Sequence, residues 1–329
     1  MTRSHTQQQG MVLLMVLLIF SVVAVLATSM IDRQSIDIER SQTLFTQQQA
    51  RLYALGAESA TRSGLYMDWE ADAAIDHAME EWTVERTFPL DPGIINIRIQ
   101  DAQGRFNLNS LLPGGASAVH EQRFKNLLSL LGLEPVIASD WAKWLNKESN
   151  VDNKYLSMEP SYRPAYQACK HTSELMLIEG VDLTAYAKLE PYIACLPASV
   201  QLNVNTALDF VLASIDSRLT LTDAEQLIAE RGQAGFKSVQ DFMGSSVLSK
   251  LKNGARNDES STGSAGNEEQ TPLVETDFSV TTEFFEMFAR IDLNGRIGTV
   301  EALIYRNKAD GSMATVRRDF SRRAAREAW

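Results

Sequence analysis

The segment MVLLMVLLIFSVVAVLATSM, residues 11–30, decides how the rest of the chain is organised. No residue from position 11 to position 27 is charged. An α-helix rises about 1.5 Å per residue, so the segment is long enough to cross a bilayer core of ~30 Å. We therefore predict a membrane-spanning helix close to the N-terminus.

A polar leader of ten residues, MTRSHTQQQG, precedes this segment and ends in Gly10. A secretory signal has its cleavage site after the apolar stretch, whereas the small residue stands before it here. This order predicts cleavage between Gly10 and Met11, which leaves the apolar helix on the mature chain. The alternative is a secretory signal that is cleaved after Ala27.

The helical pattern continues beyond the membrane segment. Ile31, Ile38, Phe45 and Leu52 recur every seven residues, and the first proline of the chain is Pro89. We expect one long helix that reaches residue 64 or so, with this stripe holding its distal half across a sheet.

The leader and the unbroken apolar helix resemble the type IV prepilin class, whose leader is removed by a prepilin peptidase. The resemblance implies a cytoplasmic N-terminus, a single pass through the inner membrane and a periplasmic head. The fifth mature residue, a glutamate in that class, is Met15 here. In that class the glutamate neutralises the terminal amine of a neighbouring subunit inside the apolar filament core, where an unpaired charge is costly. Its absence resembles the K-type minor pseudopilins of the type II secretion system.

Composition narrows the classes of function. The 329 residues carry a net charge of −11 and are 44% hydrophobic, which suits one membrane span and one or two soluble domains. The acidic balance argues against nucleic-acid binding. The sequence contains no phosphate-binding glycine loop or nucleophile elbow, so we expect no enzyme activity. Its four histidines show no metal-ligand spacing: His5, His77, His120 and His171.

A strand is predicted from residue 94, where Ile95, Ile97 and Ile99 alternate with polar residues. A turn at residues 101–104 should lead to a second strand that carries Phe106 and the leucines at 108 and 111. The run DAQGRFNLNSLL, residues 101–112, is typical of K-type pseudopilins.

Residues 116–244 have helical periodicity and predict an all-helical insertion, too long to be a loop. K-type pseudopilins are similar in carrying such an insertion, and SELMLIEG from Ser173 and NVNTALDFVL from Asn203 resemble their sequences. Residues 245–276 are rich in Ser, Gly, Asn, Glu and Asp, which predicts a flexible linker.

Three further strands are expected at residues 278–291, 297–305 and 313–320, because Asn294-Gly295 and Asp310-Gly311 are strong hairpin signals. Residues 65–115 and 277–329 would together form one domain. The predicted fold is therefore α+β and type IV pilin-like: a long N-terminal helix, partly transmembrane, packs on an antiparallel sheet that the all-α insertion interrupts.

A calcium site is the one chemical hypothesis that survives. The resemblance implies an acidic calcium loop in the insertion, and the matching run here begins at Trp144, with asparagine and glutamate in place of two aspartates. Independently, the spacing from residue 148 to residue 159 fits a calcium loop, except that Asn153 stands where the glycine is required. A solvated acidic loop is the alternative. The candidate ligands are Asn146, Glu148, Asn150, Asp152 and Glu159.

Two cysteines, Cys169 and Cys195, lie well past the span. In an oxidising periplasm they could form a disulfide, and two buried thiols are the alternative. The C-terminal arginines, from Arg317 to Arg326, are either a solvated tail or a contact for an acidic partner.

Residues 222–243 resemble half of a helix-hairpin-helix module, which in other proteins binds DNA backbone. The preceding hairpin lacks glycine, and four acidic residues surround the motif, so we interpret it as a packing motif. A periplasmic binding or DNA-uptake protein with a cleaved signal is the alternative to a pseudopilin.

The resemblance as a whole implies a minor pseudopilin at the tip of the pseudopilus, which starts its assembly and supports protein export. The implied partners are the minor pseudopilins I, J and then H, the major pseudopilin G, the prepilin peptidase and the inner membrane, with no nucleic acid. The I-type and J-type subunits would be held through packing of the N-terminal helices along Ile31, Ile38, Phe45 and Leu52.

Overall fold

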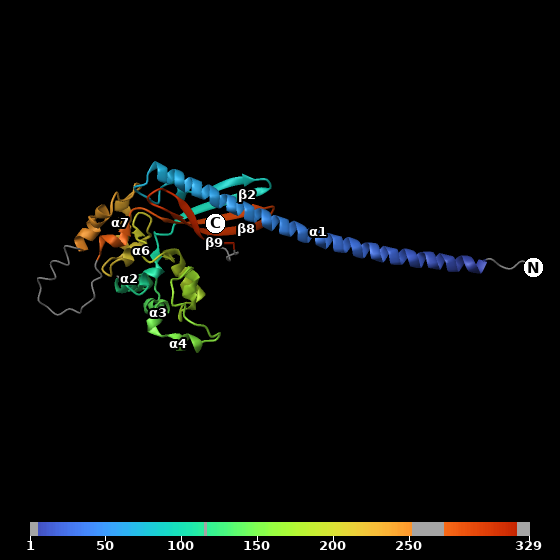
Figure 1. Cartoon of the computed structure of the whole chain (residues 1–329), viewed down its shortest axis with the longest axis horizontal. Coiled ribbons are helices and arrows are strands. Elements are labelled where there is room, and N and C mark those ends of the chain that lie inside the picture. The colour runs from blue at the N-terminus through green and yellow to red at the C-terminus, as the bar shows by residue number, and fades with distance from the viewer. Residues whose placement is uncertain (1–5, 115–116, 252–272, 321–329) are drawn as a thin grey trace, which may run out of the picture.

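The computed structural model describes residues 6–114, 117–251 and 273–320. A single helix, α1 (Thr6–Ala71), projects from a head that contains the remaining elements (Figure 1). By length and composition α1 could cross a membrane, and its apolar window, near the N-terminus, is not buried by the rest of the chain. The helix continues to Ala71, beyond the predicted end near residue 64, because no helix-breaking residue intervenes.

Five strands form one antiparallel sheet in the order β1-β2-β7-β8-β9. Residues far apart in the chain meet in it, since Ile97 pairs with Ala289 and Ala289 with Val300. Asn294 and Gly295 both have positive φ in the β7–β8 turn, as the hairpin signal predicts. The strands are β1 (Arg86–Leu90), β2 (Gly93–Asp101), β7 (Phe284–Leu293), β8 (Arg296–Arg306) and β9 (Met313–Asp319).

The distal half of α1 packs on this sheet through alanines rather than through the predicted stripe. Ala50, Ala54 and Ala57 are buried against β2, β7 and β8. The approach is close, because a Cβ on Gly298 would lie 3.0 Å from the Cβ of Ala50. Ile31, Ile38, Phe45 and Leu52 are each 58–69% exposed. The prediction that this stripe lies across the sheet was therefore wrong, because small side chains bring the helix nearer to the sheet.

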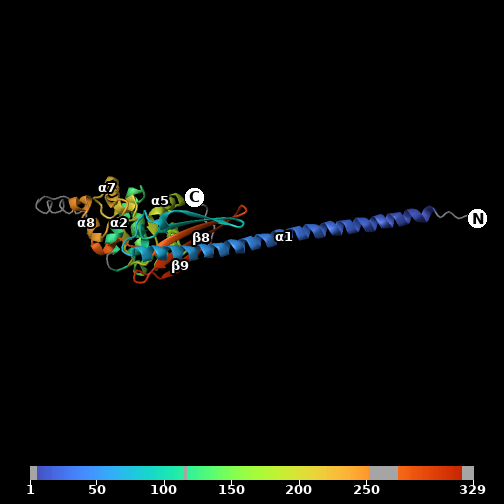
Figure 2. The ribbon, with the colours of Figure 1, turned by 90° about the horizontal axis from the view of Figure 1, so that it is seen from above.

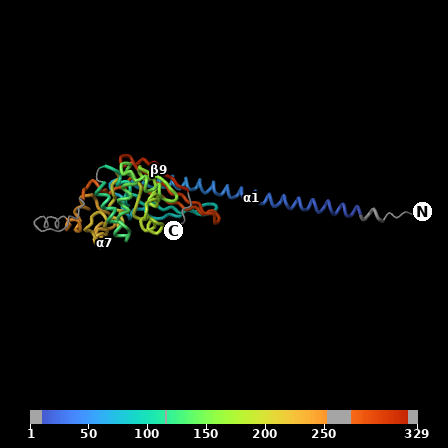
Figure 3. Tube along the Cα trace, turned by 90° about the horizontal axis from the view of Figure 1, so that it is seen from below, coloured from blue at the N-terminus to red at the C-terminus, as the bar shows by residue number. Residues whose placement is uncertain are grey.

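The insertion lies on the other side of the sheet from α1. Seen from above, α1 passes in front of the strands (Figure 2), whereas the green and yellow segments of the insertion lie in front when the molecule is seen from below (Figure 3). Its α-helices are α2 (Ser117–Leu130), α3 (Val136–Leu145), α4 (Asp152–Leu156), α5 (Leu183–Leu189), α6 (Asp209–Ser214), α7 (Leu221–Arg231) and α8 (Val239–Met243).

The insertion has two hydrophobic cores. The first surrounds Trp141 and Trp144, and the second surrounds Leu212 and Phe242. Residues 246–251 are also helical, and Leu248 in this segment is fully buried in the second core. The helical part thus extends into the predicted linker at 245–276, most of which lies outside the described residues.

Two short parallel pairs join the insertion to the strands: β3 (Phe106–Asn107) with β4 (Ile193–Ala194), and β5 (Leu202–Asn203) with β6 (Phe278–Ser279). The insertion is therefore not purely helical. The expected strand from Phe106 to Leu111 ends after two residues, because the Asn107 side chain accepts a hydrogen bond from the N–H of Asn109 and starts a 3-10 turn. The 3-10 helices are η1 (Glu81–Thr83), η2 (Leu108–Leu111), η3 (Lys147–Ser149), η4 (Thr172–Leu177), η5 (Glu190–Tyr192) and η6 (Glu275–Asp277).

Candidate functional site

The first candidate surface is the part of α1 that projects from the head, residues 11–42, where every residue is exposed. Gly10 and Met11, which flank the predicted cleavage site, both lie within this helix. Met15 is 65% exposed and offers an apolar side chain where a carboxylate was expected from the prepilin class. A continuous exposed row of large apolar residues is unfavourable in water, so this face requires a membrane or other helices around it.

A second set of residues, which we call the polar joint, connects the sheet to the insertion. It consists of Asp101, Gln103, Asn107, Asn109 and Asn203, drawn from two of the sequence motifs described above. All five side chains are buried, and each makes hydrogen bonds to other parts of the chain. Buried polar groups that are fully paired fix one arrangement of the elements they join.

Asp101, the last residue of β2, is the centre of the joint. Its carboxylate accepts hydrogen bonds from the Gln103 N–H at 2.7 Å, from Asn203 Nδ2 at 2.9 Å and from Thr206 Oγ1 at 2.6 Å. The Thr282 hydroxyl also donates to it. Burial raises the pKa of Asp101 to about 6, although the hydrogen bonds from Thr206 and Thr282 lower it.

Gln103 and Gly104, which follow Asp101, also contact distant parts of the chain. The Gln103 amide oxygen accepts the N–H groups of Glu283 at 2.6 Å and Phe284 at 3.1 Å, at the start of β7. A Cβ on Gly104 would lie 2.9 Å from the carbonyl oxygen of Thr206, so only glycine allows the two backbones to approach this closely.

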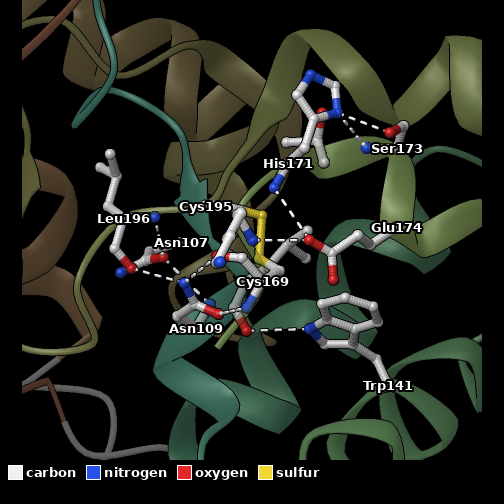
Figure 4. Close-up of a disulfide and its surroundings, with 12 residues drawn as sticks. Asn107, Asn109, Trp141, Cys169, His171, Ser173, Glu174, Cys195 and Leu196 are labelled. Carbon is white, nitrogen blue, oxygen red and sulfur yellow. Dashed lines mark hydrogen bonds between the residues drawn. A yellow bond between two sulfur atoms is a disulfide. The ribbon is translucent and has the colours of Figure 1, made fainter. Parts of the chain in front are cut away.

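Asn107 and Asn109 hold the first core of the insertion (Figure 4). Asn107 donates to the carbonyl of Pro197 at 2.9 Å and accepts the N–H of Leu196 at 3.1 Å. Asn109 donates to the carbonyls of Cys169 at 3.0 Å and Leu196 at 2.8 Å. The asparagines of the FNLNSLL run therefore replace backbone pairing that a longer strand would have provided.

Cys169 and Cys195 are joined by a disulfide, with Cα atoms 5.7 Å apart (Figure 4). The bond connects the loop before η4 to the residue that follows β4. Glu174 orders the same loop, because its carboxylate accepts the N–H groups of Lys170 at 2.7 Å and His171 at 3.2 Å.

The helix-hairpin-helix-like segment makes internal contacts. The Asn205 side chain accepts the N–H of Phe236 at 2.7 Å and donates to its carbonyl at 3.1 Å, which fixes the loop between α7 and α8. Arg231 is also turned inward and donates to the carbonyls of Val204 and Ala207. The backbone of Phe236 and the side chain of Arg231 therefore make hydrogen bonds within the chain.

The predicted calcium ligands lie on a segment that contains η3 and α4, not on a continuous calcium-binding loop. Asn150 adopts positive φ, whereas Asn153, at the position expected to need it, lies in α4. The side-chain oxygen of Asn146 accepts the N–H of Glu148 at 2.9 Å. Glu148 and Glu159 are exposed, and Asp152 begins α4.

Of the residues that the structure describes, one set of three acidic side chains brings ligand atoms within 4.8 Å of one another: Asp68, Asp76 and Glu80. Arg306 already lies there as a cation. Its guanidinium is 3.4 Å from the Asp68 carboxylate and forms a short ion pair with Asp76, and both Arg306 and Asp76 are buried. Burial raises the pKa of Asp68 to about 6 and that of Glu80 to about 7, and nearby carboxylates add to both shifts.

Sequence reasoning missed the pairing of Arg306 with Asp76 and the role of Asp101, although Asp101 stood in a quoted motif. The signal in the sequence was the position of Asp101 directly after the alternating apolar residues of β2, where a charged side chain that becomes buried needs hydrogen-bond partners.

Comparisons with known proteins match the two halves of the insertion separately. A family model described as "Type II secretion system (T2SS), protein K" covers residues 104–198, and a second model of the same description covers residues 202–262. The type II secretion system protein K of Pseudomonas aeruginosa is 31% identical over 95% of this chain and 93% of its own length.

The chain belongs to the type II secretion system protein K family. The protein K of Klebsiella pneumoniae is 32% identical over 76% of this chain and 83% of its own length. The fold also matches a chain of the crystal structure of the GspK-GspI-GspJ complex from enterotoxigenic Escherichia coli. That match has a TM-score of 0.72 and 24% identity, and it covers 86% of this chain and 99% of the other. The boundary between the two protein K models, at residues 198–202, falls between the first and second hydrophobic cores.

Proposed function

We propose that this member of the protein K family is a minor pseudopilin with a pilin-like head, placed at the tip of the periplasmic pseudopilus. In this proposal it is an assembly component and not an enzyme: it starts assembly with the I-type and J-type pseudopilins, then H and the major pseudopilin G, and it supports export of folded proteins. The observation that carries the proposal is the exposed apolar face of α1, with Met15 in place of a carboxylate.

The argument for the tip has two parts. A subunit inside the apolar bundle must neutralise the buried amine of a neighbour, and Met15 offers no charge for that purpose. A founding subunit has no earlier amine to meet. In addition, the insertion adds a bulky two-core domain to the head, which would collide with subunits above it in a close-packed array. The competing model is a tolerated apolar substitution on a shaft subunit whose insertion projects sideways.

Sequencing the mature N-terminus tests the class of protein. Cleavage by a prepilin peptidase gives a chain that starts at Met11 with the apolar helix retained. A chain that starts at Thr28 or Ser29 would instead identify a secretory signal and would reject the pseudopilin proposal.

Replacing Met15 by glutamate tests the position. We expect Met15→Glu alone to add little incorporation along the shaft, because the insertion still blocks it. Deleting the insertion as well should permit shaft incorporation. Wild-type chains found at regular intervals along isolated pseudopili would contradict the tip model.

A further inference from the structure

A groove lies between the distal end of α1, residues 77–84 and the β1 edge of the sheet. It exists because α1 packs mainly on β7 and β8, leaving the same face of β1 partly uncovered. The floor of the groove is formed by Phe88 of β1 with Ile97 and Ile99 of β2. Phe88 pairs with the buried Ile95, so its side chain lies on the face of the sheet that α1 packs against. We call this the β1 groove.

Four apolar side chains around the β1 groove are exposed. Met67 is 68% exposed, Met79 63%, Val84 61% and Phe88 43%. They come from α1, from the segment that follows it and from β1, so the exposure is shared by three elements. Contiguous apolar surface of this kind is characteristic of a protein–protein contact.

The α1 wall of the β1 groove can accept a closely approaching segment. Ala60, Gly64, Met67 and Ala71 are spaced by four, three and four residues, which places them on one helical face, and all four are exposed. A Cβ at Gly64 would meet nothing within 4 Å. Met67 follows Ile31 by 36 residues, or ten turns at 3.6 residues per turn, so this face continues the one that carries Ile31.

Three carboxylates line the β1 groove: Asp68, Glu80 and Glu81. Arg306 lies 3.4 Å from the Asp68 carboxylate and the Arg86 guanidinium lies 3.2 Å from the Glu81 carboxylate. Burial disfavours the charged forms of Asp68 and Glu80, as the raised pKa values described above indicate. A cation brought near Glu80 would stabilise the charged form of its carboxylate, for which the described residues supply no arginine or lysine partner within 4 Å.

We propose that the β1 groove binds an apolar segment, carrying a lysine or arginine, of a neighbouring pseudopilin subunit. This inference rests on the proposed function and adds a specific docking surface to it. The apolar residues of the segment would cover Met67, Val84 and Phe88, and its basic side chain would reach the Glu80 and Glu81 carboxylates. The GspK-GspI-GspJ complex named above makes the I-type and J-type subunits the appropriate probes.

The test uses the full-length chain in detergent, with purified I-type and J-type subunits of the same secretion system. Gly64→Leu fills the open wall without weakening the helix, because leucine has a higher helix propensity than glycine. Glu81→Lys reverses a charge on a side chain that is 93% exposed. We expect each variant to weaken retention of an I-type or J-type subunit at least tenfold. Leu183→Asp, at a 75% exposed position of α5 outside the groove, is the matched control and should bind normally.

Cross-linking gives an independent readout. A benzophenone amino acid in place of Met79 should form a product with an I-type or J-type subunit, at a segment that contains a basic residue, whereas the same group in place of Leu183 should not. Normal binding by both groove variants, or cross-links only within the chain or to lipid, would overturn the inference and leave the pseudopilin proposal intact. Failure of the wild-type chain to bind either subunit would count against both.

Discussion

The side chain of Asn109 makes two hydrogen bonds with the backbone of Cys169, sixty residues away in the sequence: Oδ1 accepts the N–H at 2.7 Å, and Nδ2 donates to the carbonyl at 3.0 Å. The same amide donates to the carbonyl of Leu196 at 2.8 Å. One buried side chain thus fixes both segments that carry the disulfide.

Replacing this asparagine should destabilise the head. Asn109→Ala leaves buried backbone groups without partners, and we expect a loss of about 2–4 kcal/mol in the free energy of unfolding. Urea denaturation of the full-length chain in detergent measures it. Asn153→Ala, at an exposed position of α4, is the control and should change stability by less than ~0.5 kcal/mol. Equal effects of the two substitutions would show that Asn109 does not connect the elements.

The disulfide predicts a simple result on thiol labelling. After denaturation without reductant, neither Cys169 nor Cys195 should be alkylated, and reduction should expose both. Closing a loop of this length stabilises by about 3.5 kcal/mol in the chain-entropy model, so reduction should also lower the midpoint of unfolding. Mass spectrometry reads out the labelling. Alkylation of both cysteines before reduction would reject the bond.

The calcium hypothesis predicts ligand-dependent stability. If the segment at 146–159 binds calcium, the melting temperature of the purified chain should rise with calcium concentration, by the equivalent of about 2.7 kcal/mol at a hundred times Kd. Asp152→Asn and Glu159→Gln should reduce that rise, whereas Glu225→Gln, on the exposed face of α7, should not. An unchanged melting temperature would exclude stabilising calcium binding.

Glu80 predicts a pH dependence of stability. Its pKa is about 7 in the folded chain against an ordinary value of 4.5, so the folded state binds the proton more tightly than the unfolded state does. Stability should therefore fall as pH rises from about 4.5 to 7. Glu80→Gln should flatten this fall by on the order of 1 kcal/mol, since partial solvent exposure screens the effect.

Denaturation of the full-length chain at pH 5 and pH 8 checks this prediction. Glu85→Gln, at an exposed position of the same segment, is the matched control. A Glu80→Gln chain that keeps the full wild-type difference between the two pH values would show that Glu80 is not responsible.

The two faces of α1 should respond differently to substitution. Ala54→Leu adds volume where the helix contacts the sheet and should cost about 1–3 kcal/mol of stability. Leu52→Ala removes an exposed side chain and should leave stability within ~0.5 kcal/mol, while weakening association with partner pseudopilins. Thermal unfolding and co-purification separate the two effects. A large loss of stability in Leu52→Ala would place that residue in the intramolecular core.

Patterns within short stretches of the sequence correctly predicted those strands and turns that neighbouring residues determine. Alternation at Ile95, Ile97 and Ile99 indicated β2, and Asn294-Gly295 indicated the β7–β8 hairpin. The same reasoning failed where a distant partner decides the outcome. The stretch after Phe106 leaves the extended conformation through the local bond from the Asn109 N–H to the Asn107 side chain, and the turn is held by bonds from Asn107 and Asn109 to residues some sixty to ninety positions away. No strand was predicted at residues 86–90, and Pro89 can lie in β1 because β1 is at the edge of the sheet.

The stripe on α1 failed for another reason. Hydrophobic periodicity identifies a face that avoids water, but it does not say which molecule covers that face. Both Ala54 and Leu52 are apolar, yet Ala54 is buried against the sheet and the larger Leu52 is exposed. A helix can use one apolar face to pack within its own chain and another to contact a different molecule. The spacing of apolar residues in the sequence does not distinguish the two faces.

From the end of the apolar segment at Met30, α1 stands clear of the head until Thr43, whose hydroxyl accepts a hydrogen bond from Arg296 at 2.6 Å. Those thirteen residues span about 20 Å of helix. If residues 11–30 lie in a bilayer, as the proposed function requires, this free length of helix would hold the head at a fixed distance from the lipid surface. If the proposed function holds, partner subunits anchored in the same membrane would meet this head by diffusion in two dimensions, which confines the first encounter of a pseudopilus to a layer near the lipid surface.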